Sequence, residues 1–240
     1  MTFKHFLLTR FNLGLYDRKQ KTRDKKRIDP EVWMNNRIEL VRKYTAPSIA
    51  NQKSKNFVWI IVVDPQTSSK HFDSIVSLVP SSACVVEGEN FRKTSSSTIE
   101  ELLLRTNSKP DRVITSRIDA DDAIHRSYIG TIQDWFQRKQ RTGVLTFPKG
   151  LVYDSLKEKL YHLRYVKNHF LTFVEKRGPK PVRTVLRARH TALTDMFQTF
   201  KCETKPPLWL EVVHEDNLAK YSRGDRIPMS KLIRSDYGIS

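Results

Sequence analysis

The sequence predicts an α/β fold in which a mainly parallel, Rossmann-like sheet is flanked by helices. In the first half of the chain, apolar runs alternate with stretches of helical periodicity, as in strand–helix–strand units. Residues 57–63 form a continuous apolar, β-branched run, which is typical of a strand buried on both faces. From residue 143 onward, shorter alternating runs indicate β-hairpins added in the C-terminal half. A chain of 240 residues is long enough for one large domain.

The first half predicts four strands with three helices between and after them. The strands are expected at residues 3–8, 57–63, 83–86 and 112–118. The first helix begins at Asp29–Glu31, because Asp caps a helix, Pro fits its first position and an acid favours its first turn. We expect this helix to end at Pro47. A second helix opens with the capping box at Ser97–Glu100, and a third carries an apolar stripe from Ile124 to Phe136.

The second half predicts short strands, one further helix and a final strand. The hairpin strands are expected at residues 144–147, 151–153, 160–166 and 170–174. A helix is expected near Thr191–Phe200, and a strand at Leu208–Val213 runs into His214. Within that strand, Trp209 either packs in the core or lines a sugar site, and we favour the core. The last twenty residues are polar, basic and only weakly periodic.

The composition excludes several classes of protein. Apolar residues make up 38% of the chain and aromatic residues 10%, which excludes a collagen, a coiled coil and a disordered chain. Two cysteines without a CxxC pair exclude a disulfide scaffold and a structural zinc cage. The longest apolar run is far shorter than the ~20 residues that span a bilayer, and no cleavage site follows the N-terminal run. We therefore expect a cytoplasmic protein.

The net charge of +17 favours an anionic partner. Two basic runs carry much of this charge, at residues 18–27 and 176–189. Neither run alternates with aromatic residues, which a stacking platform for single-stranded nucleic acid would need. Two readings stay open: solvated basic loops, or a peripheral contact with an anionic membrane or another polyanion.

The acidic segment Asp119–Asp122 is the strongest local signal, because its sequence Asp-Ala-Asp-Asp directly follows a predicted buried strand. Ligands of open α/β sheets bind outside the carboxyl ends of the strands. Three carboxylates so close together repel one another, and a cation offsets that repulsion. Oxygen ligands suit Mg²⁺ or Mn²⁺, which keep positions open for phosphate groups. The alternative is an Asp-rich turn that caps the helix after it.

No competing catalytic motif occurs, since the sequence lacks a dinucleotide-binding GxGxxG, a P-loop, HExxH and GxSxG. Of the seven histidines, His214 is singled out because it ends a predicted strand beside Glu211, Glu215 and Asp216. This second cluster can supply a third metal ligand and a general base.

Taken together, these segments resemble the rhamnosyltransferase family of GT-A-type glycosyltransferases. The matching segments are His5–Asn12, Trp33 with Arg37, Pro47–Ser48 with Gln52, Asn56–Trp59, Ser116–Asp122, Phe147–Gly150, Phe170–Thr172 with Glu175, and Trp209–Leu210 with Val213, His214 and Asn217. They run from about residue 3 to residue 220. Their order and spacing carry the resemblance, and no single segment does.

The resemblance implies a GT-A-like fold with a nucleotide-sugar donor in the first half and an acceptor in the second. The corresponding divisions are residues 1–122 for the donor, 123–220 for the acceptor and 221–240 for a C-terminal tail. The positions that match donor-binding residues are Thr9, Arg10, Asn12, Asp64, Arg117 and Asp119. Those that match metal ligands are Asp119, Asp121 and His214, with Asp122 in support. The general base is expected to be Asp216 or, second, Glu211.

The resulting hypothesis is a metal-dependent, inverting glycosyltransferase. It is expected to use Mn²⁺ or Mg²⁺ and to move rhamnose from a dTDP- or UDP-linked donor to a glycan or glycolipid. One rival is a metal-dependent nuclease that uses the same acids, with the basic surface holding its substrate. A second rival is a basic nucleic-acid-binding module without activity. Against that rival, no recognition-helix or RNP pattern occurs, so nucleic acid is the less favoured partner.

Overall fold

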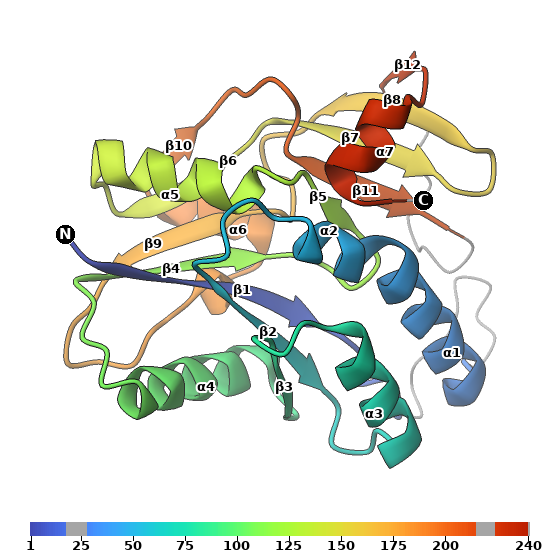
Figure 1. The fold of residues 1–240 in the computed structure, drawn as a ribbon. Coiled ribbons are helices and arrows are strands. Elements are labelled where there is room, and N and C mark those ends of the chain that lie inside the picture. The colour runs from blue at the N-terminus through green and yellow to red at the C-terminus, as the bar shows by residue number, and fades with distance from the viewer. Residues whose placement is uncertain (18–27, 215–223, 240) are drawn as a thin grey trace.

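The computed structural model describes residues 1–17, 28–214 and 224–239, which form two sheets with helices packed around them (Figure 1). The larger sheet has seven strands in the order β10-β6-β9-β4-β1-β2-β3. These strands are β1 (Phe3–Arg10), β2 (Val58–Val63), β3 (Cys84–Glu87), β4 (Arg112–Arg117), β6 (Gly143–Thr146), β9 (Thr172–Lys176) and β10 (Thr199–Lys201). The predicted α/β class is therefore confirmed.

The centre of the larger sheet is parallel, as the apolar runs predict. Strand β1 pairs in parallel with β2 on one side and with β4 on the other, and β2 pairs in parallel with β3. Strand β9 is the exception, because it runs antiparallel between β4 and β6. Since β1, β2 and β4 point the same way, their carboxyl ends meet at one edge of the sheet.

Helices cover both faces of the larger sheet (Figure 1). One face packs against α1 (Pro30–Leu40), α3 (Ser69–Leu78) and α5 (Tyr128–Lys139), with a core that contains Met34, Ile75 and Ile132. The other face packs against α4 (Phe91–Arg105) and α6 (His190–Met196), with a core that contains Ile99 and Leu193. Two-sided burial explains why the central strands read as continuous apolar runs.

The smaller sheet was not predicted as a separate sheet. Its five strands lie in the order β12-β8-β7-β11-β5. They are β5 (Ala123–Ile124), β7 (Lys149–Asp154), β8 (Lys159–Arg164), β11 (Trp209–Val213) and β12 (Asp225–Ile227). The β7–β8 hairpin thus joins β11 instead of extending the larger sheet, whereas β6 and β9 do join the larger one. The predicted tail contributes β12 and α7 (Lys231–Tyr237) to this region.

The first helix begins where it was predicted but does not end at Pro47. The Asp29 carboxylate accepts hydrogen bonds from the backbone N–H groups of Glu31 and Val32, as an N-cap does. Beyond α1 the chain makes a π-helical turn over Val41–Thr45 and continues as α2 (Ala46–Ala50). Pro47 falls in the first turn of α2, where a missing N–H is tolerated.

The predicted capping box at Ser97–Glu100 is wrong. Helix α4 begins six residues earlier at Phe91, and the Asn90 side chain accepts from the N–H of Lys93. The hydroxyl groups of Ser97 and Thr98 both donate to the carbonyl of Thr94, inside the helix. A Ser-Thr pair followed by Glu is thus compatible with a helix interior when its hydroxyls bond back to the preceding turn.

Several sequence features lie outside the described residues: the basic run at 18–27, the candidate base Asp216, and its neighbours Glu215 and Asn217. Among the helices that the structure does describe, none combines the length and the apolar character needed to cross a membrane.

Candidate active site

The acidic segment Asp119–Asp122 joins the two sheets. It leaves β4 in the larger sheet, where the N–H of Ile118 still bonds the carbonyl of Leu8. Directly after it, β5 pairs antiparallel with β11 of the smaller sheet, with Ala123 opposite Leu210. Because that pairing is antiparallel, residues before β5 lie beside residues after Leu210. Asp121 and Asp122, which directly precede β5, therefore lie beside the carboxyl end of β11.

Asp121 contacts one guanidinium group and one imidazole ring. Its Oδ2 atom lies 2.5 Å from an Arg37 nitrogen and 2.9 Å from Nε2 of His214. Arg37 comes from α1, where its guanidinium also lies 4.7 Å from the ring centroid of Trp33. Burial alone would raise the pKa of Asp121, but the charge of Arg37 and the hydrogen bond of His214 outweigh it, so the pKa is lowered to about 2. Asp121 is therefore an anion at every ordinary pH.

Asp122 is the most enclosed acid of the segment, with 3% of the residue exposed. Its Oδ1 accepts from the backbone N–H of Val212 at 2.9 Å, and its Oδ2 lies 2.7 Å from Nε2 of His169. Burial raises the pKa of Asp122 to about 7 despite that hydrogen bond. For His169, burial acts against the positive charge, but Asp122 and Asp119 prevail and raise the pKa to about 9. Both oxygens of Asp122 are thus engaged by protein groups.

Asp119 lies between a cation and the His169 pair. Its Oδ1 accepts two hydrogen bonds from Arg117, from Nε at 3.2 Å and from a terminal nitrogen at 2.9 Å. Its Oδ2 lies 3.9 Å from Nε2 of His169. About a third of its side chain is exposed, at 34%, so Asp119 is the acid of the segment that solvent or a ligand reaches most easily.

The donor atoms around this segment suit a hard divalent cation. Oxygen or nitrogen atoms of Asp119, Asp122 and His169 lie within 4.8 Å of one another. Asp121 and His214 add a second carboxylate–imidazole contact at the other side of the motif. Carboxylate oxygens are ligands that suit Mg²⁺ and Mn²⁺. Because a histidine must be neutral to bind a metal, occupation by His169 would release its proton.

The alternative reading, in which the acids cap the next helix, is wrong. Helix α5 begins at Tyr128, and Ser127 occupies the capping position without a side-chain hydrogen bond to the helix. The acids instead lie in the turn between β4 and β5. Their side chains face arginine and histidine partners, as described above, and not helix N–H groups.

Four of the positions matched to donor-binding residues lie at or just beyond the ends of β1 and β2: Thr9, Arg10, Asn12 and Asp64. The side chain of Asn12 donates to Thr67 Oγ1 and accepts from the backbone N–H of Asp64, which ties the two strand ends together. The Asp64 carboxylate accepts from the N–H groups of Gly14 and Gln66. Arg10, in contrast, is exposed and borders a small cavity of about 100 Å³.

Thr9 is enclosed in the core, with 1% of the residue exposed, and its hydroxyl accepts a hydrogen bond from the Trp59 indole. Trp209 is also a core residue, as favoured from the sequence. It stacks on Phe170 at a centroid distance of 5.1 Å and donates to the carbonyl of Phe147.

Of the two candidate bases, only Glu211 lies among the described residues. It is half-buried on β11, where burial raises the pKa of its carboxyl. The charges of Asp121 and Asp119 act in the same direction, whereas His169 opposes them. A carboxyl with a raised pKa is better suited to accept a proton near neutral pH than an ordinary surface glutamate.

Sequence reasoning missed three residues of the site: Arg37, His169 and His190. The family resemblance includes Arg37 and the segment that follows His169, but residue patterns alone assign neither of them to the site. Nothing in local spacing marks His169, since it meets Asp122 through the antiparallel pairing of β4 and β9. His190, at the first turn of α6, lies with its ring 6.4 Å from that of His169. A long-range pairing map would have been needed to find either histidine.

A mainly parallel α/β sheet with an acidic turn after a central strand defines the GT-A-like class that the sequence predicts. The family model described as "Putative rhamnosyl transferase" matches residues 4–226, and the chain belongs to that family. The predicted membership in a glycosyltransferase family is thereby confirmed. No curated protein matches the chain.

Several solved structures are similar at low sequence identity. TarS of S. aureus in complex with UDP is 12% identical over 88% of this chain and 60% of that chain, with a TM-score of 0.47. TarS 1-349 alone is 11% identical, with coverages of 87% and 60% and a TM-score of 0.43. A "putative nucleotide-diphospho-sugar transferase" from Desulfovibrio desulfuricans G20 is 10% identical, with coverages of 88% and 82% and a TM-score of 0.43. The chain spans about three fifths of these TarS structures.

Proposed function

We propose that the protein is a metal-dependent, inverting glycosyltransferase. In this proposal it moves rhamnose from a dTDP- or UDP-linked donor to a glycan or glycolipid acceptor. The observation that carries the proposal is the acidic turn Asp119–Asp122, whose three carboxylates face Arg37, Arg117, His169 and His214 at the junction of the two sheets. Membership in the family supplies the reaction class.

The residues that would hold the cation are Asp119, Asp121 and His214. Both oxygens of Asp122 already accept from protein groups, so Asp122 is better placed to orient the turn than to bind an ion. When bound, Mg²⁺ or Mn²⁺ would neutralise the diphosphate that leaves the sugar. Arg117, fixed against Asp119, adds a preorganised positive charge at the same edge of the sheet.

The proton of the acceptor hydroxyl requires a base, because inversion places the acceptor oxygen directly on the anomeric carbon. We assign this role to Asp216 first and to Glu211 second. Glu211 lies on β11, the strand that leads to His214, so either acid comes from the segment that borders the metal ligands. The raised pKa of Glu211 agrees with such a role.

The first test is thermal unfolding with UDP-, dTDP- and GDP-sugars, each with and without Mn²⁺. A ligand at 100 times its Kd stabilises the folded state by about 2.7 kcal/mol. We expect a shift that needs both nucleotide and metal. A shift with an oligonucleotide, together with none for any sugar nucleotide, would favour a nucleic-acid role instead.

The second test replaces Asp121 by Asn, which keeps the shape of the side chain and removes its charge. Sugar transfer and donor hydrolysis should both fall by about two orders of magnitude or more. Asp134→Asn, on the exposed side of α5, is the matched control and should retain activity. Transfer at the wild-type rate by Asp121→Asn would exclude the assignment.

A third measurement distinguishes the two possible metal sets by Mn²⁺ titration followed by electron paramagnetic resonance. His214→Gln should weaken Mn²⁺ binding, whereas His169→Gln should leave it largely intact. The reverse result would assign the ion to Asp119, Asp122 and His169.

A further inference from the structure

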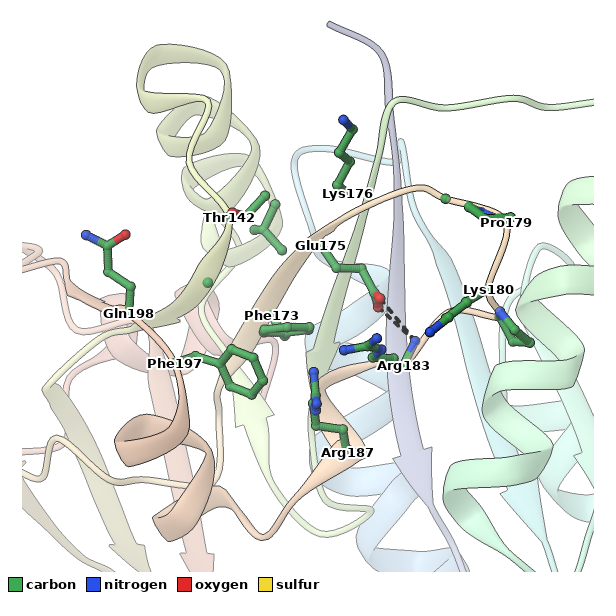
Figure 2. A pocket seen from close by; sticks show the side chains of 14 residues that line it. Thr142, Phe173, Glu175, Lys176, Pro179, Lys180, Arg183, Arg187, Phe197 and Gln198 are labelled. Atoms are coloured by element: carbon green, nitrogen blue, oxygen red, sulfur yellow. Dashed lines mark hydrogen bonds between the residues drawn. The ribbon is translucent and has the colours of Figure 1, made fainter.

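A second cavity, of about 550 Å³, lies on the α4–α6 face of the larger sheet (Figure 2). No residue of the acidic turn lines it. Strand β9 forms one wall through Phe173–Lys176. Residues 178–187, which return along the sheet after β9, and Phe197–Gln198, which follow α6, form the others. Its size falls in the range of ~300–1,000 Å³ that small-ligand sites occupy.

Four cations line this cavity, and no described residue forms an ion pair with them. They are Lys176, Lys180, Arg183 and Arg187. The one acid in the lining, Glu175, uses its carboxylate to accept from the backbone N–H groups of Arg183 and Thr184 at 2.9 to 3.1 Å. Glu175 therefore fixes the returning segment. Its charge acts on Arg187 from nearby, but it forms no ion pair with the guanidinium group of Arg183 or Arg187.

Arg187 is held in place by an aromatic pair. Its guanidinium carbon lies 4.5 Å from the ring centroid of Phe197, which meets Phe173 edge to face at 4.9 Å. Figure 2 shows the side chains of Arg183 and Arg187 on the same side of these two rings. Burial and the nearby charge of Arg183 lower the pKa of Arg187, as expected where positive charge is crowded.

We propose that this cavity binds an oxyanion, a carboxylate or a phosphate, carried by an acidic sugar of the acceptor glycan. The identification of the ligand as acceptor rests on the proposed function. The planar fork of donors on a guanidinium group matches the geometry of carboxylate and phosphate oxygens. Lys176, Lys180 and Arg183 are exposed, and Arg187 is partly buried against Phe197. The concave lining around Arg187 suits one anionic group of a chain better than a flat membrane surface.

The cavity is connected to the acidic turn by α6. His190 begins this helix beside His169, and Phe197 follows it at the cavity. Seven helical residues span about 10 Å, so the two sites are separated by a distance that a short oligosaccharide bridges. An acceptor with acidic units along its chain would place one anion here while another unit reaches the acidic turn.

Direct binding tests this inference without relying on transfer. Titration calorimetry would use an oligogalacturonate as the carboxylate probe, an oligosaccharide with a terminal mannose 6-phosphate as the phosphate probe, and maltotetraose as the neutral probe. We expect at least one acidic probe to bind and maltotetraose not to bind. The double variant Arg183→Gln/Arg187→Gln should weaken that binding by at least about tenfold.

A matched control removes the same charge elsewhere. Arg226→Gln/Lys231→Gln alters two exposed cations on β12 and α7, and it should leave the binding of acidic sugars unchanged. An equal loss in both double variants would show only a general effect of net charge and would overturn the proposal. Binding only to vesicles with anionic lipid, or only to an oligonucleotide, would also overturn it.

Donor hydrolysis without acceptor separates this inference from the proposed function. The double variant Arg183→Gln/Arg187→Gln should hydrolyse the sugar nucleotide at the wild-type rate. If hydrolysis persists but no acidic sugar binds, the cavity proposal fails and the transferase stands. If acidic sugars bind in the arginine-dependent way but no sugar nucleotide is ever cleaved, the transferase fails and the oxyanion site stands.

Discussion

At the scale of single residues, a buried histidine on a central strand of the larger sheet makes the stability of the fold depend on pH. His5 is 2% exposed on β1, and its Nε2 atom lies 2.9 Å from Ser116 Oγ on β4. On its other side, Nδ1 lies 3.4 Å from the side-chain nitrogen of Gln133 on α5. Burial lowers the pKa of His5 from 6.5 to about 3, so the folded protein keeps this ring neutral.

The free energy of unfolding should therefore fall as the pH falls from about 6.5 toward 3. In this window the unfolded chain binds a proton on His5 and the folded chain does not. The free energy of unfolding therefore falls by roughly 1 kcal/mol for each pH unit. Urea unfolding at several pH values would measure the slope. In His5→Gln the slope should be smaller by about that amount, even if the variant is less stable overall. An unchanged slope would mean that His5 is accessible to protons.

The acidic turn shows what residue patterns predict and what they miss. Asp-Ala-Asp-Asp after an apolar run predicts acids at the ligand-binding edge of a sheet, and the structure places them there. The contact between Asp121 and His214 brings together two residues that the family resemblance matches to metal ligands. The partnership of Asp122 with His169 could not be predicted, because it depends on β9 running antiparallel beside β4.

At the scale of elements, the C-terminal helix α7 is fixed by its last turn. Tyr237 is 1% exposed, and its hydroxyl donates to the carbonyl of Pro207. Gly238 ends the helix with a φ of +65°, and a Cβ there would lie 2.8 Å from the carbonyl oxygen of Pro47. Glycine is required here both for the left-handed backbone and for the close approach to α2.

Gly238→Ala should consequently lower the free energy of unfolding by about 1 kcal/mol or more. Gly178→Ala is the matched control, since a Cβ at Gly178 meets no atom within 4 Å. The control should change stability by less than about 0.5 kcal/mol. Chemical denaturation of both variants gives the comparison, and equal values for the two would contradict the proposed role of Gly238.

Element boundaries were harder to predict than the elements. The start of α1 follows from one residue, Asp29, whose capping bonds are local. The start of α4 does not, because the stretch Thr94–Thr98 offers several hydroxyls that suit a cap, and they bond back to carbonyls instead. Which choice wins depends on how Ile99 and Leu103 pack under the sheet, and that information is not local.

At the scale of the whole molecule, Trp209 joins the two sheets. It belongs to β11 of the smaller sheet but packs in the core under the larger one, against Phe170. Gly150 on β7 makes room for it, since a Cβ there would lie 2.0 Å from the indole ring. The position of β11, and with it that of His214, therefore depends on this contact.

Gly150→Ala should lower stability and donor hydrolysis together, because displacement of the indole shifts the strand that carries His214. The expected cost in stability is about 1–3 kcal/mol. Gly130→Ala, in α5, is the control: its Cβ would have an ordinary 3.8 Å contact with Ser54, and alanine favours a helix by up to about 1 kcal/mol. A thermal melt and a hydrolysis assay of each variant test this. If Gly150→Ala loses stability but hydrolyses the donor at the wild-type rate, donor hydrolysis does not depend on the contact of Trp209 between the two sheets.

The smaller sheet is the part of the whole molecule that sequence patterns could not give. Its strands were expected individually, but β7 and β11 pair in parallel across more than fifty residues, with Leu151 beside Leu210. Alternation of apolar and polar residues identifies a strand and its faces, yet not its partner. The hairpin could equally have extended the larger sheet, as was expected.

The π-helical turn at Val41–Thr45 also determines how α1 is rotated about its own axis relative to α2. Each residue of an α-helix turns the chain by about 100°. A π-helical turn holds more residues than an α-helical turn does. Trp33 and Arg37 therefore point in a different direction from the one that a regular α-helix continuing through Ala50 would give them. The direction of Arg37, the cationic neighbour of Asp121, thus depends on a π-helical turn several residues further along the chain. Conversion of that turn to regular α-helix would turn Arg37 away without altering a single residue of the acidic turn.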